Sequence, residues 1–419
     1  MQHAKLMVLF YLTINMLTNI LMLFAGLSDF STIVPFLRYF SLSSHGFYKH
    51  TERMLNKTQK IYTSDNCGTI KEMALSVLRQ IDSSETVLKI TFFHLPHDNV
   101  EYLSNNATLR NVTKEHFGNR NTPLVSYIAQ KPLQNILTAE VTFLSEEDVT
   151  LTRQDKYTIL KKGDTKELIT EGIIPQDINT STYAQASNIF DTISCILSEN
   201  GFNVNDIYRQ WNYIEGITTL NDGRQNYQDF NDARSIFYSQ ASWMNGYPAA
   251  TGIGTGRGGV MIEIYAQNGN GINMPIDNPM QISAHNYSQN VLAGKTTKEL
   301  SQKTTPKFER ARITESTIYI SGTAAIKGEE SLPTNETTAQ VAATMEIMDC
   351  LISKENIPVK SNGSIYDTLR IYVKHEADIN NVQCFMNQHY PIPEKLYLVC
   401  DICRPELLIE IEGTAHTKQ

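Results

Sequence analysis

An internal repeat is the sequence feature that most limits how this chain can fold. The segments AQASNIFDTISCIL (184–197) and AQVAATMEIMDCLI (339–352) both begin with Ala-Gln, carry an acidic residue midway and have a cysteine near the end. Their apolar residues recur at helical spacing, which predicts two amphipathic helices. A chain that repeats a helix in this way is expected to repeat the structure around it.

The residues downstream of the two predicted helices continue the correspondence. Each helix is followed by a strand-like run, then by a second helix ending at Tyr, and then by a strand in which acidic and apolar residues alternate. The matched segments are 206–217 with 367–379, 226–238 with 378–390, and the strands around Glu263 and around Glu410 and Glu412. The order β, β, α, β, α, β thus occurs twice, which predicts an α+β fold with mixed sheets and helices on one face of each sheet. A weaker echo lies at 69–93.

Length and charge limit the classes of function. With 419 residues and 41% hydrophobic content, the chain is long enough for two or three domains. We expect a degenerate N-terminal domain at 60–290 and a C-terminal domain at 300–416. A net charge of -8 without a Lys/Arg-rich run argues against a nucleic-acid partner. The six cysteines are too sparse for a disulfide scaffold.

We expect residues 1–30 to be a hydrophobic leader or an extension that precedes the true start of the protein. Residues 6–28 contain no charged side chain and are about as long as a membrane-spanning helix. Polar residues interrupt the run, however, and no clear cleavage site follows it. Three interpretations remain open: a membrane or export leader, an extension from a misplaced start codon, and an amphipathic surface helix.

Two motifs that suggest a cofactor or a metal do not have the right context. Gly254, Gly256 and Gly259 fit the GxGxxG pattern, but a loop precedes them and a strand follows, whereas a dinucleotide site needs a strand before and a helix after. We expect these glycines to allow a sharp turn or a close approach of the backbone. Cys400 and Cys403 form a single CxxC inside an apolar run, which favours packed cysteines over a zinc site. We therefore expect no cofactor and no metal.

Several ordered motifs together resemble one known family. The repeated unit that ends in IEIEGTA is similar to the RidA-like superfamily, and the combination resembles the chorismatase family within it, over roughly residues 60–416. The motifs are RQWNYI (209–214), NYQDFNDAR (226–234), PAATGIG (248–254), PKFERA (306–311), ISGTAAIKGEES (320–331) and CDICRPELLIEIEG (400–413). The resemblance implies a duplicated RidA-like (chorismate-mutase-like) fold that acts as a monomer. It also implies a substrate site near the junction of the two halves, with no obligatory protein partner.

The resemblance implies that the enzyme removes the enolpyruvyl group of chorismate as pyruvate. An enol ether becomes reactive toward water once its terminal methylene carbon is protonated, so the site needs a buried, protonated acid. The resemblance assigns this role to Glu330, with neighbouring Glu329 pointing away into solvent. A carboxyl group suits the role if burial raises its pKa.

Binding residues follow from the same motifs. Chorismate carries two carboxylates, and guanidinium groups bind carboxylates through paired hydrogen bonds. The resemblance implies that the substrate-binding residues are Arg310, Arg234, Tyr227, Tyr213, Thr323, Ala324, Ala250 and Gly252. Subtypes that form a hydroxybenzoate resemble one another in a smaller residue at position 250 and a cysteine at position 323. Ala250 and Thr323 therefore favour hydrolysis to the dihydroxycyclohexadiene carboxylate.

Two alternative functions stay open. One is an imine deaminase of the RidA type, although such enzymes have an Arg where this chain has Glu394. The other is a small-ligand-binding protein without catalysis. Because chorismate is a cytoplasmic metabolite, we expect the folded part to work in the cytoplasm, with membrane association through the N-terminal segment still open.

Overall fold

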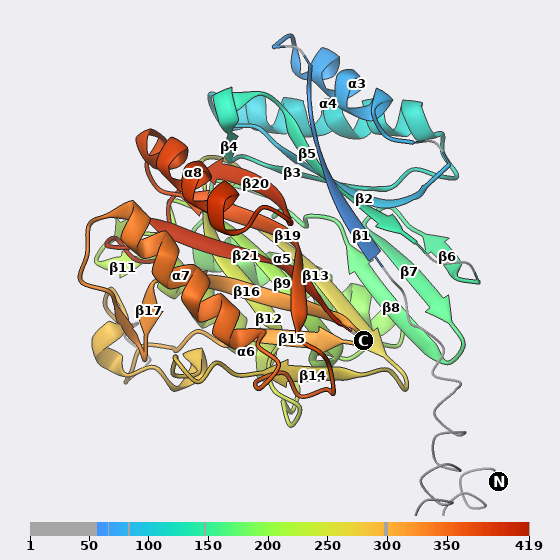
Figure 1. Cartoon of the computed structure of the whole chain (residues 1–419). Coiled ribbons are helices and arrows are strands. Elements are labelled where there is room, and N and C mark those ends of the chain that lie inside the picture. Colours follow the sequence, from blue (N-terminus) through green and yellow to red (C-terminus); the bar gives the residue numbers. More distant parts are fainter. Residues whose placement is uncertain (1–56, 66, 83, 146–147, 297–300, 419) are drawn as a thin grey trace, which may run out of the picture. The chain divides into compact units, whose positions relative to one another are not determined.

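One pattern of strands and helices occurs three times along the chain (Figure 1). The computed structural model describes residues 57–418 except 66, 83, 146–147 and 297–300, all within one compact unit, Met54–Gln419. In each copy a strand is followed by a helix, a second strand, a second helix and two further strands. We call these copies the first, second and third repeats.

The repeats are defined by the following elements. The first repeat comprises β1 (Lys57–Thr63), α3 (Ile70–Arg79), β2 (Thr86–Phe93), α4 (Asn99–Phe117), β3 (Leu124–Ile128) and β5 (Thr138–Leu144). The second repeat comprises β8 (Thr165–Thr170), α5 (Thr182–Glu199), β9 (Ile207–Glu215), α6 (Asn226–Tyr238), β12 (Ala249–Thr255) and β13 (Val260–Asn268). The third repeat comprises β16 (Thr317–Ala324), α7 (Thr337–Leu351), β19 (Ser364–Val373), α8 (Ile379–His389), β20 (Glu394–Val399) and β21 (Ile409–Thr417).

The strand order is the same in all three sheets. It reads β1-β5-β2-β3 in the first repeat, β8-β13-β9-β12 in the second and β16-β21-β19-β20 in the third. The second and third strands of each repeat run parallel, and the other neighbours run antiparallel. A parallel pair needs a crossover connection, which the second helix of each repeat supplies.

Short strands extend this plan. The second sheet gains β6 (Thr150–Arg153) and β7 (Tyr157–Lys162), and the third gains β14 (Asn273–Ile276) and β15 (Ala311–Thr314). The first repeat also sends β4 (Lys131–Pro132) to the edge of the third sheet, where it pairs with β20. Two small hairpins are β10 (Leu220–Asn221) with β11 (Arg224–Gln225) and β17 (Ile326–Lys327) with β18 (Glu330–Ser331).

The predicted α+β class and the mixed sheets are confirmed, but the prediction of two copies is incomplete. The weak echo at 69–93 is α3 and β2 of the first repeat. Its second helix, α4, has the mostly polar sequence NVEYLSNNATLRNVTKEHF, and two of its few apolar residues, Val100 and Leu103, are exposed. The apolar periodicity that marks a helix is therefore weak there, which hid the first repeat.

The Ala-Gln pair that begins both matched helices has a structural reason. The side-chain oxygen of Gln185 accepts a hydrogen bond from the backbone nitrogen of Val260 at 2.8 Å, at the start of β13. In the same way Gln340 accepts one from Leu408, just before β21, also at 2.8 Å. Each glutamine thus ties the first turn of its helix to the last strand of its repeat.

Buried ion pairs connect the three repeats in a cycle. Lys89 on β2 pairs with Glu263 on β13 (2.7 Å), and Arg209 on β9 pairs with Glu412 on β21. Arg370 on β19 closes the cycle by pairing with Glu140 on β5 (2.6 Å). The side chains of these pairs are at most 6% exposed. A cation on the second strand of each repeat is therefore neutralised by a carboxylate on the last strand of the next repeat.

Within the described ranges, no helix combines the length and the apolar character needed to cross a bilayer. The predicted leader or extension at residues 1–30 lies outside the described residues.

Candidate functional site

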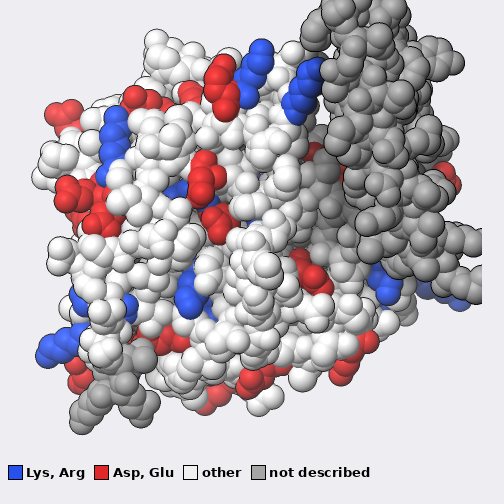
Figure 2. Space-filling model, turned by 90° about the horizontal axis from the view of Figure 1, so that it is seen from below, with Lys and Arg blue, Asp and Glu red and all other residues white. Residues whose placement is uncertain are grey.

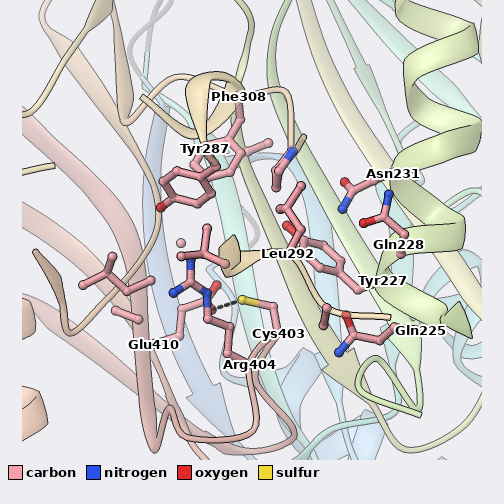
Figure 3. A pocket seen from close by; sticks show the side chains of 18 of the residues that line it. Gln225, Tyr227, Gln228, Asn231, Tyr287, Leu292, Phe308, Cys403, Arg404 and Glu410 are labelled. Carbon is pink, nitrogen blue, oxygen red and sulfur yellow. Dashed lines mark hydrogen bonds between the residues drawn. The ribbon is translucent and has the colours of Figure 1, made fainter. Parts of the chain in front are cut away.

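A cavity lies where the second repeat meets the third (Figure 3). The space between its lining residues amounts to about 760 Å³ when the open solvent at its mouth is included. The second repeat contributes α6 and β12, and the third contributes β16, β21 and the segment after β20. The loop between β14 and β15 supplies the remaining walls, including Tyr287, Leu292 and Phe308.

Small residues form one wall of the cavity and let other groups approach. Ala250 and Gly252 on β12 lie there with Gly322 and Ala324 on β16. The two strands are joined by Ser321, whose hydroxyl accepts the Ala250 N–H at 2.9 Å and donates to the carbonyl of Glu309 at 2.6 Å.

Two glycines in this wall cannot be replaced without movement. A Cβ on Gly252 would lie 2.8 Å from the ring of Tyr227, and a Cβ on Gly322 would lie 2.1 Å from Oε1 of Glu410. Both distances are shorter than real Cβ contacts, so glycine at these positions gives the phenol and the carboxyl group their space.

Glu410 is a buried carboxyl group that faces the cavity. It lies on β21, is 4% exposed and lines the cavity wall. Burial raises the pKa of Glu410 to about 8. The charge of Glu412 adds to this shift, and the charge of Arg209 opposes it. Glu410 therefore carries a proton at neutral pH, which fits the pKa that general acid catalysis requires.

Comparison of the repeats shows that Glu410 is an addition to the common plan. In each repeat, a β-bulge leaves one residue of the second strand without a partner on the last strand. When the three repeats are aligned on this bulge, Glu412 matches Glu140 and Glu263. These three carboxylates form the buried ion pairs described above. By the same alignment, Thr138 and Met261 occupy the position of Glu410 in the other two repeats.

Two guanidinium groups lie in the cavity wall with Glu410. Arg310 is 4% exposed and donates to the Tyr287 hydroxyl at 2.8 Å and to the carbonyl of Ile282, while its Nε has no partner among the described residues. Arg404 is half-buried; its Nη1 donates to the carbonyl of Glu329 at 3.0 Å. The cavity thus combines a neutral acid with two fixed cations.

Helix α6 presents a phenol and amide groups to the cavity. Tyr227, Gln228 and Asn231 line it, and burial raises the pKa of the Tyr227 hydroxyl, which therefore stays protonated. Arg234 lies behind them at 1% exposure and donates to the side-chain oxygen of Asn231 at 2.5 Å. Because an arginine can only donate, this bond fixes the Asn231 amide and leaves its NH₂ group for other partners.

The structure brings together five of the predicted binding residues. Arg310, Tyr227, Ala250, Gly252 and Ala324 all line the cavity.

Three predicted binding residues do not reach the cavity wall. Arg234 acts through Asn231, as described above. The Tyr213 hydroxyl accepts from Arg370 at 2.7 Å inside the buried ion-pair cluster, and Thr323 donates to the carbonyl of Ser321 at 2.9 Å. A strand alternates its side chains between two faces, so neighbours of a lining residue point elsewhere.

The structure places Glu330, the acid that the resemblance implies, on the hairpin beside the cavity and not among the residues of its wall. Glu330 is exposed on β18 and lines a neighbouring surface hollow that shares Arg404 and Leu292 with the cavity. Glu329 is not among the residues that line the cavity, and its carboxylate accepts the Ser288 N–H at 2.6 Å.

Sequence analysis missed the roles of Glu410, Arg404 and Asn231 in this site. Glu410 was seen only as an acid in an alternating strand. The signal that distinguishes it is the repeat itself, because the matched strand VMIEIYA has one acid where LLIEIEGTA has two.

The glycine-rich and cysteine motifs have structural roles. Gly258 and Gly259 adopt positive φ angles of 94° and 67° in the turn between β12 and β13. A Cβ on Gly254 would lie 2.5 Å from the carbonyl oxygen of Asp401, so the expected close backbone approach is confirmed. Cys403 lines the cavity 4.0 Å from Glu410, and burial raises the pKa of its thiol to about 12. No metal-binding cluster of three or more such side chains occurs among the described residues.

Comparisons with known proteins agree on one family. Residues 142–266 match the model of the N-terminal part of FkbO/Hyg5-like chorismatases. The chain is 31% identical over 253 residues to a chorismatase of Streptomyces rapamycinicus, covering 55% of this chain and 69% of that protein. It is 29% identical over 251 residues to a 3-hydroxybenzoate synthase of Streptomyces hygroscopicus, covering 56% and 70% of the two chains.

The fold also has a counterpart among solved structures. A chorismatase crystal structure superimposes with a TM-score of 0.64 at 20% identity, covering 86% of this chain and 98% of that one.

Proposed function

The chain belongs to the chorismatase family, and from this premise we propose that it removes the enolpyruvyl group of chorismate as pyruvate, with Glu410 as the acid. The observation that carries the proposal is a buried carboxyl group, protonated at neutral pH, in the wall of a cavity that also holds two arginines. In this proposal the acid is Glu410, and Glu330, which the family resemblance implies, is the alternative acid.

The proposed reaction begins with proton transfer from Glu410 to the terminal methylene carbon of the enol ether. The product is an oxocarbenium ion, which a water molecule attacks. The Glu410 carboxylate takes up the proton that this water loses, and the resulting hemiketal collapses to pyruvate and the ring alcohol. The acid starts and ends protonated, so hydrolysis to the dihydroxycyclohexadiene carboxylate consumes one water in each cycle and needs no cofactor.

Arg310 and Arg404 are the proposed partners of the two substrate carboxylates. On the described part of the face in Figure 2, acidic and basic side chains are interspersed and do not gather by sign. With a net charge of -8, the protein as a whole repels a dianion at long range. Binding of the substrate then depends on the guanidinium groups inside the cavity. The effective dielectric constant there is lower than in water, which strengthens each ionic contact.

The structure leaves open which of the two ring products forms. The prediction of hydrolysis relied on Ala250 and on Thr323, but only Ala250 lines the cavity, and the cavity cysteine is Cys403. The prediction from Thr323, whose hydroxyl donates to the carbonyl of Ser321, stays a prediction. Product mass decides between a dihydroxycyclohexadiene carboxylate and a hydroxybenzoate.

The alternative functions make different demands on the site. An imine deaminase of the RidA type would need an arginine at position 394 to bind the carboxylate of its substrate. This chain has Glu394 there, exposed at the start of β20. A binding protein without catalysis would need the arginines but not a protonated carboxyl group beside them. The buried Glu410 thus favours the chorismate-converting function over both.

We further propose that the three repeats are copies of one RidA-like unit and act together as a monomer. The shared strand order and the cyclic ion pairs support this organisation. We propose repeats at 57–144, 165–268 and 317–417 in place of the expected domains at 60–290 and 300–416. We propose a cytoplasmic site of action, because chorismate is a cytoplasmic metabolite.

The test of function is incubation of the protein with chorismate. We expect pyruvate in stoichiometric amounts with one ring product, measured by coupled reduction of pyruvate and by mass spectrometry. Chorismate that stays intact under these conditions would refute the proposed function.

We expect activity to decline above about pH 8. The pKa of Glu410 is raised from 4.5 to about 8, so the proton that the reaction needs is lost as pH rises through that value. A plot of log kcat/KM against pH should fall on its alkaline side with a slope of about minus one, which corresponds to the loss of one proton. A profile that stays flat to pH 10 would contradict the assignment.

The same shift predicts a change in stability. Because the folded state keeps the Glu410 proton that the unfolded state releases, the free energy of unfolding should decrease between about pH 4.5 and pH 8. In the variant Glu410→Gln, the free energy of unfolding should decrease less over this pH range than in wild type, as measured by denaturant titrations.

Arg310→Lys is expected to lower kcat/KM by about 1–3 kcal/mol of transition-state stabilisation, because lysine keeps the charge but loses the planar fork. Arg310→Ala should cost more. The matched control is Arg79→Lys on the exposed end of α3, which should leave the kinetics unchanged. Equal kinetics for wild type and both Arg310 variants would remove Arg310 from the site.

A further inference from the structure

The two guanidinium groups of the cavity share one aromatic neighbour. The Cζ atoms of Arg310 and Arg404 lie 5.5 and 5.4 Å from the centre of the Tyr287 ring (Figure 3). Arg310 also donates to the Tyr287 hydroxyl at 2.8 Å and to the carbonyl of Ile282. A cation within about 6 Å of an aromatic ring is attracted to it. Both cations are therefore held against Tyr287, and a shift of this residue would change how they are spaced.

Tyr287 belongs to a segment, residues 280–288, that is bonded to the hairpin β17–β18. Gly328, in the turn of the hairpin, has a φ angle of 62°. It donates its N–H to the carbonyl of Met280 and accepts the N–H of Ile282, both at 2.9 Å. These bonds fix the beginning of the segment to the hairpin. The end of the segment, where Tyr287 lies, is bonded to a different residue of the hairpin.

Glu329 makes that second connection. Its half-buried carboxylate accepts the N–H of Ser288 at 2.6 Å, and its backbone carbonyl accepts a hydrogen bond from Nη1 of Arg404 at 3.0 Å. The Ser288 N–H holds the pKa of the Glu329 carboxyl group below its ordinary value, so this group is ionised at neutral pH. A hydrogen bond to an ionised group is stronger than a bond between neutral groups. Glu329 thus binds the neighbour of Tyr287 through its side chain and Arg404 through its backbone.

We propose that Glu329 is a positioning residue that fixes the spacing of Arg310 and Arg404 and so selects ligands with two carboxylates. This inference rests on the proposed function, because it takes the two arginines as the partners of the substrate carboxylates. It does not depend on whether Glu410 or Glu330 is the acid. The direction of a guanidinium group decides whether a carboxylate can accept two parallel hydrogen bonds from it. A small displacement of one cation therefore costs more for a ligand that needs both than for a ligand that needs one.

Two matched ligands test this spacing. 3-(Carboxymethoxy)benzoate has a ring carboxylate and an ether-linked carboxylate, as chorismate does, whereas 3-methoxybenzoate keeps the ring and the ether but has one carboxylate. The Kd of each is measured by isothermal titration calorimetry. In Glu329→Ala we expect the Kd of the dicarboxylate to rise about tenfold and that of the monocarboxylate to change by less than about twofold. Glu329→Gln keeps an oxygen that can accept the Ser288 N–H and should recover most of the loss.

Ser288→Pro removes the same hydrogen bond from its other end. Ser288 has φ -68° and ψ 159°, and Tyr287 before it has φ -58° and ψ 139°. Both residues already have the backbone conformation that a proline and the residue before it require. We expect the same loss for the dicarboxylate, and no further loss when Ser288→Pro is combined with Glu329→Ala. Ser288→Pro carries the test if Glu329→Ala does not fold.

The matched control is Glu346→Ala. It removes an exposed ion pair at 3.0 Å between Lys327 of the same hairpin and α7, and it should leave both Kd values unchanged. Equal losses for the two ligands in Glu329→Ala, or no loss for either, would overturn the proposal. It would also be overturned if wild type bound the dicarboxylate no more tightly than the monocarboxylate, because the two arginines would then not act as a pair. Because calorimetry needs no turnover, absence of pyruvate release from chorismate would instead refute the proposed function.

Discussion

Glu410→Gln is expected to lower the rate of pyruvate release from chorismate by about a hundred- to ten-thousand-fold, the usual contribution of a general acid. Glutamine has nearly the same shape as a protonated glutamic acid but cannot transfer a proton to carbon. Since the wild-type side chain is neutral in the cavity at pH 7, we expect the thermal unfolding midpoint and the binding of chorismate to change little. Stopped turnover with retained binding is therefore the expected result.

Glu330→Gln separates the two assignments of the acid. The position of Glu330 on the exposed hairpin β17–β18 predicts wild-type turnover for this variant. Loss of turnover in Glu330→Gln with full activity in Glu410→Gln would return the acid to the position that the family resemblance assigns.

Lys89→Met is expected to give the largest loss of stability. Lys89 is the ion-pair partner of Glu263 at 2.7 Å, and both side chains are at most 2% exposed. Apart from the Lys89 ammonium group, the carboxylate of Glu263 has no hydrogen-bond partner among the described residues. The variant leaves this charge buried without a counter-ion, which typically costs about 3–5 kcal/mol and is measured as the free energy of unfolding.

Two variants serve as controls for this prediction. Lys89→Met combined with Glu263→Leu removes both charges and should recover most of the loss. Lys60→Met breaks the pair with Glu85, which has the same chemistry at 46% and 33% exposure, and should cost less than about 1 kcal/mol. An equal effect of Lys60→Met and Lys89→Met would mean that the buried pair does not hold the repeats together.

Sequence reasoning predicted the second and third repeats because their helices and strands have strong apolar periodicity. It missed most of the first repeat, where the polar helix α4 lacks that periodicity. The limit is physical: a helix that buries a narrow stripe against its sheet needs few apolar residues, so its period is hard to detect.

The candidate site shows a different limit. The resemblance located the correct strands, and the small residues of β12 and β16 line the cavity as expected. It could not tell which carboxyl group near those strands is buried, because burial depends on segments far apart in the chain. Glu410 is enclosed by β12 and β16 and by the segment after β20, whereas Glu330 projects from a two-residue strand.

The cycle of buried ion pairs also has an evolutionary consequence. In a trimer of three identical subunits, any substitution appears at all three equivalent positions, so a new buried acid would be introduced three times and its desolvation cost would be met three times. A single chain with three repeats is free of that constraint. Here threonine and methionine stand at two of the equivalent positions, Thr138 and Met261, and the acid stands only at Glu410. A single polypeptide can therefore carry a buried carboxyl group at one junction that the other two junctions lack.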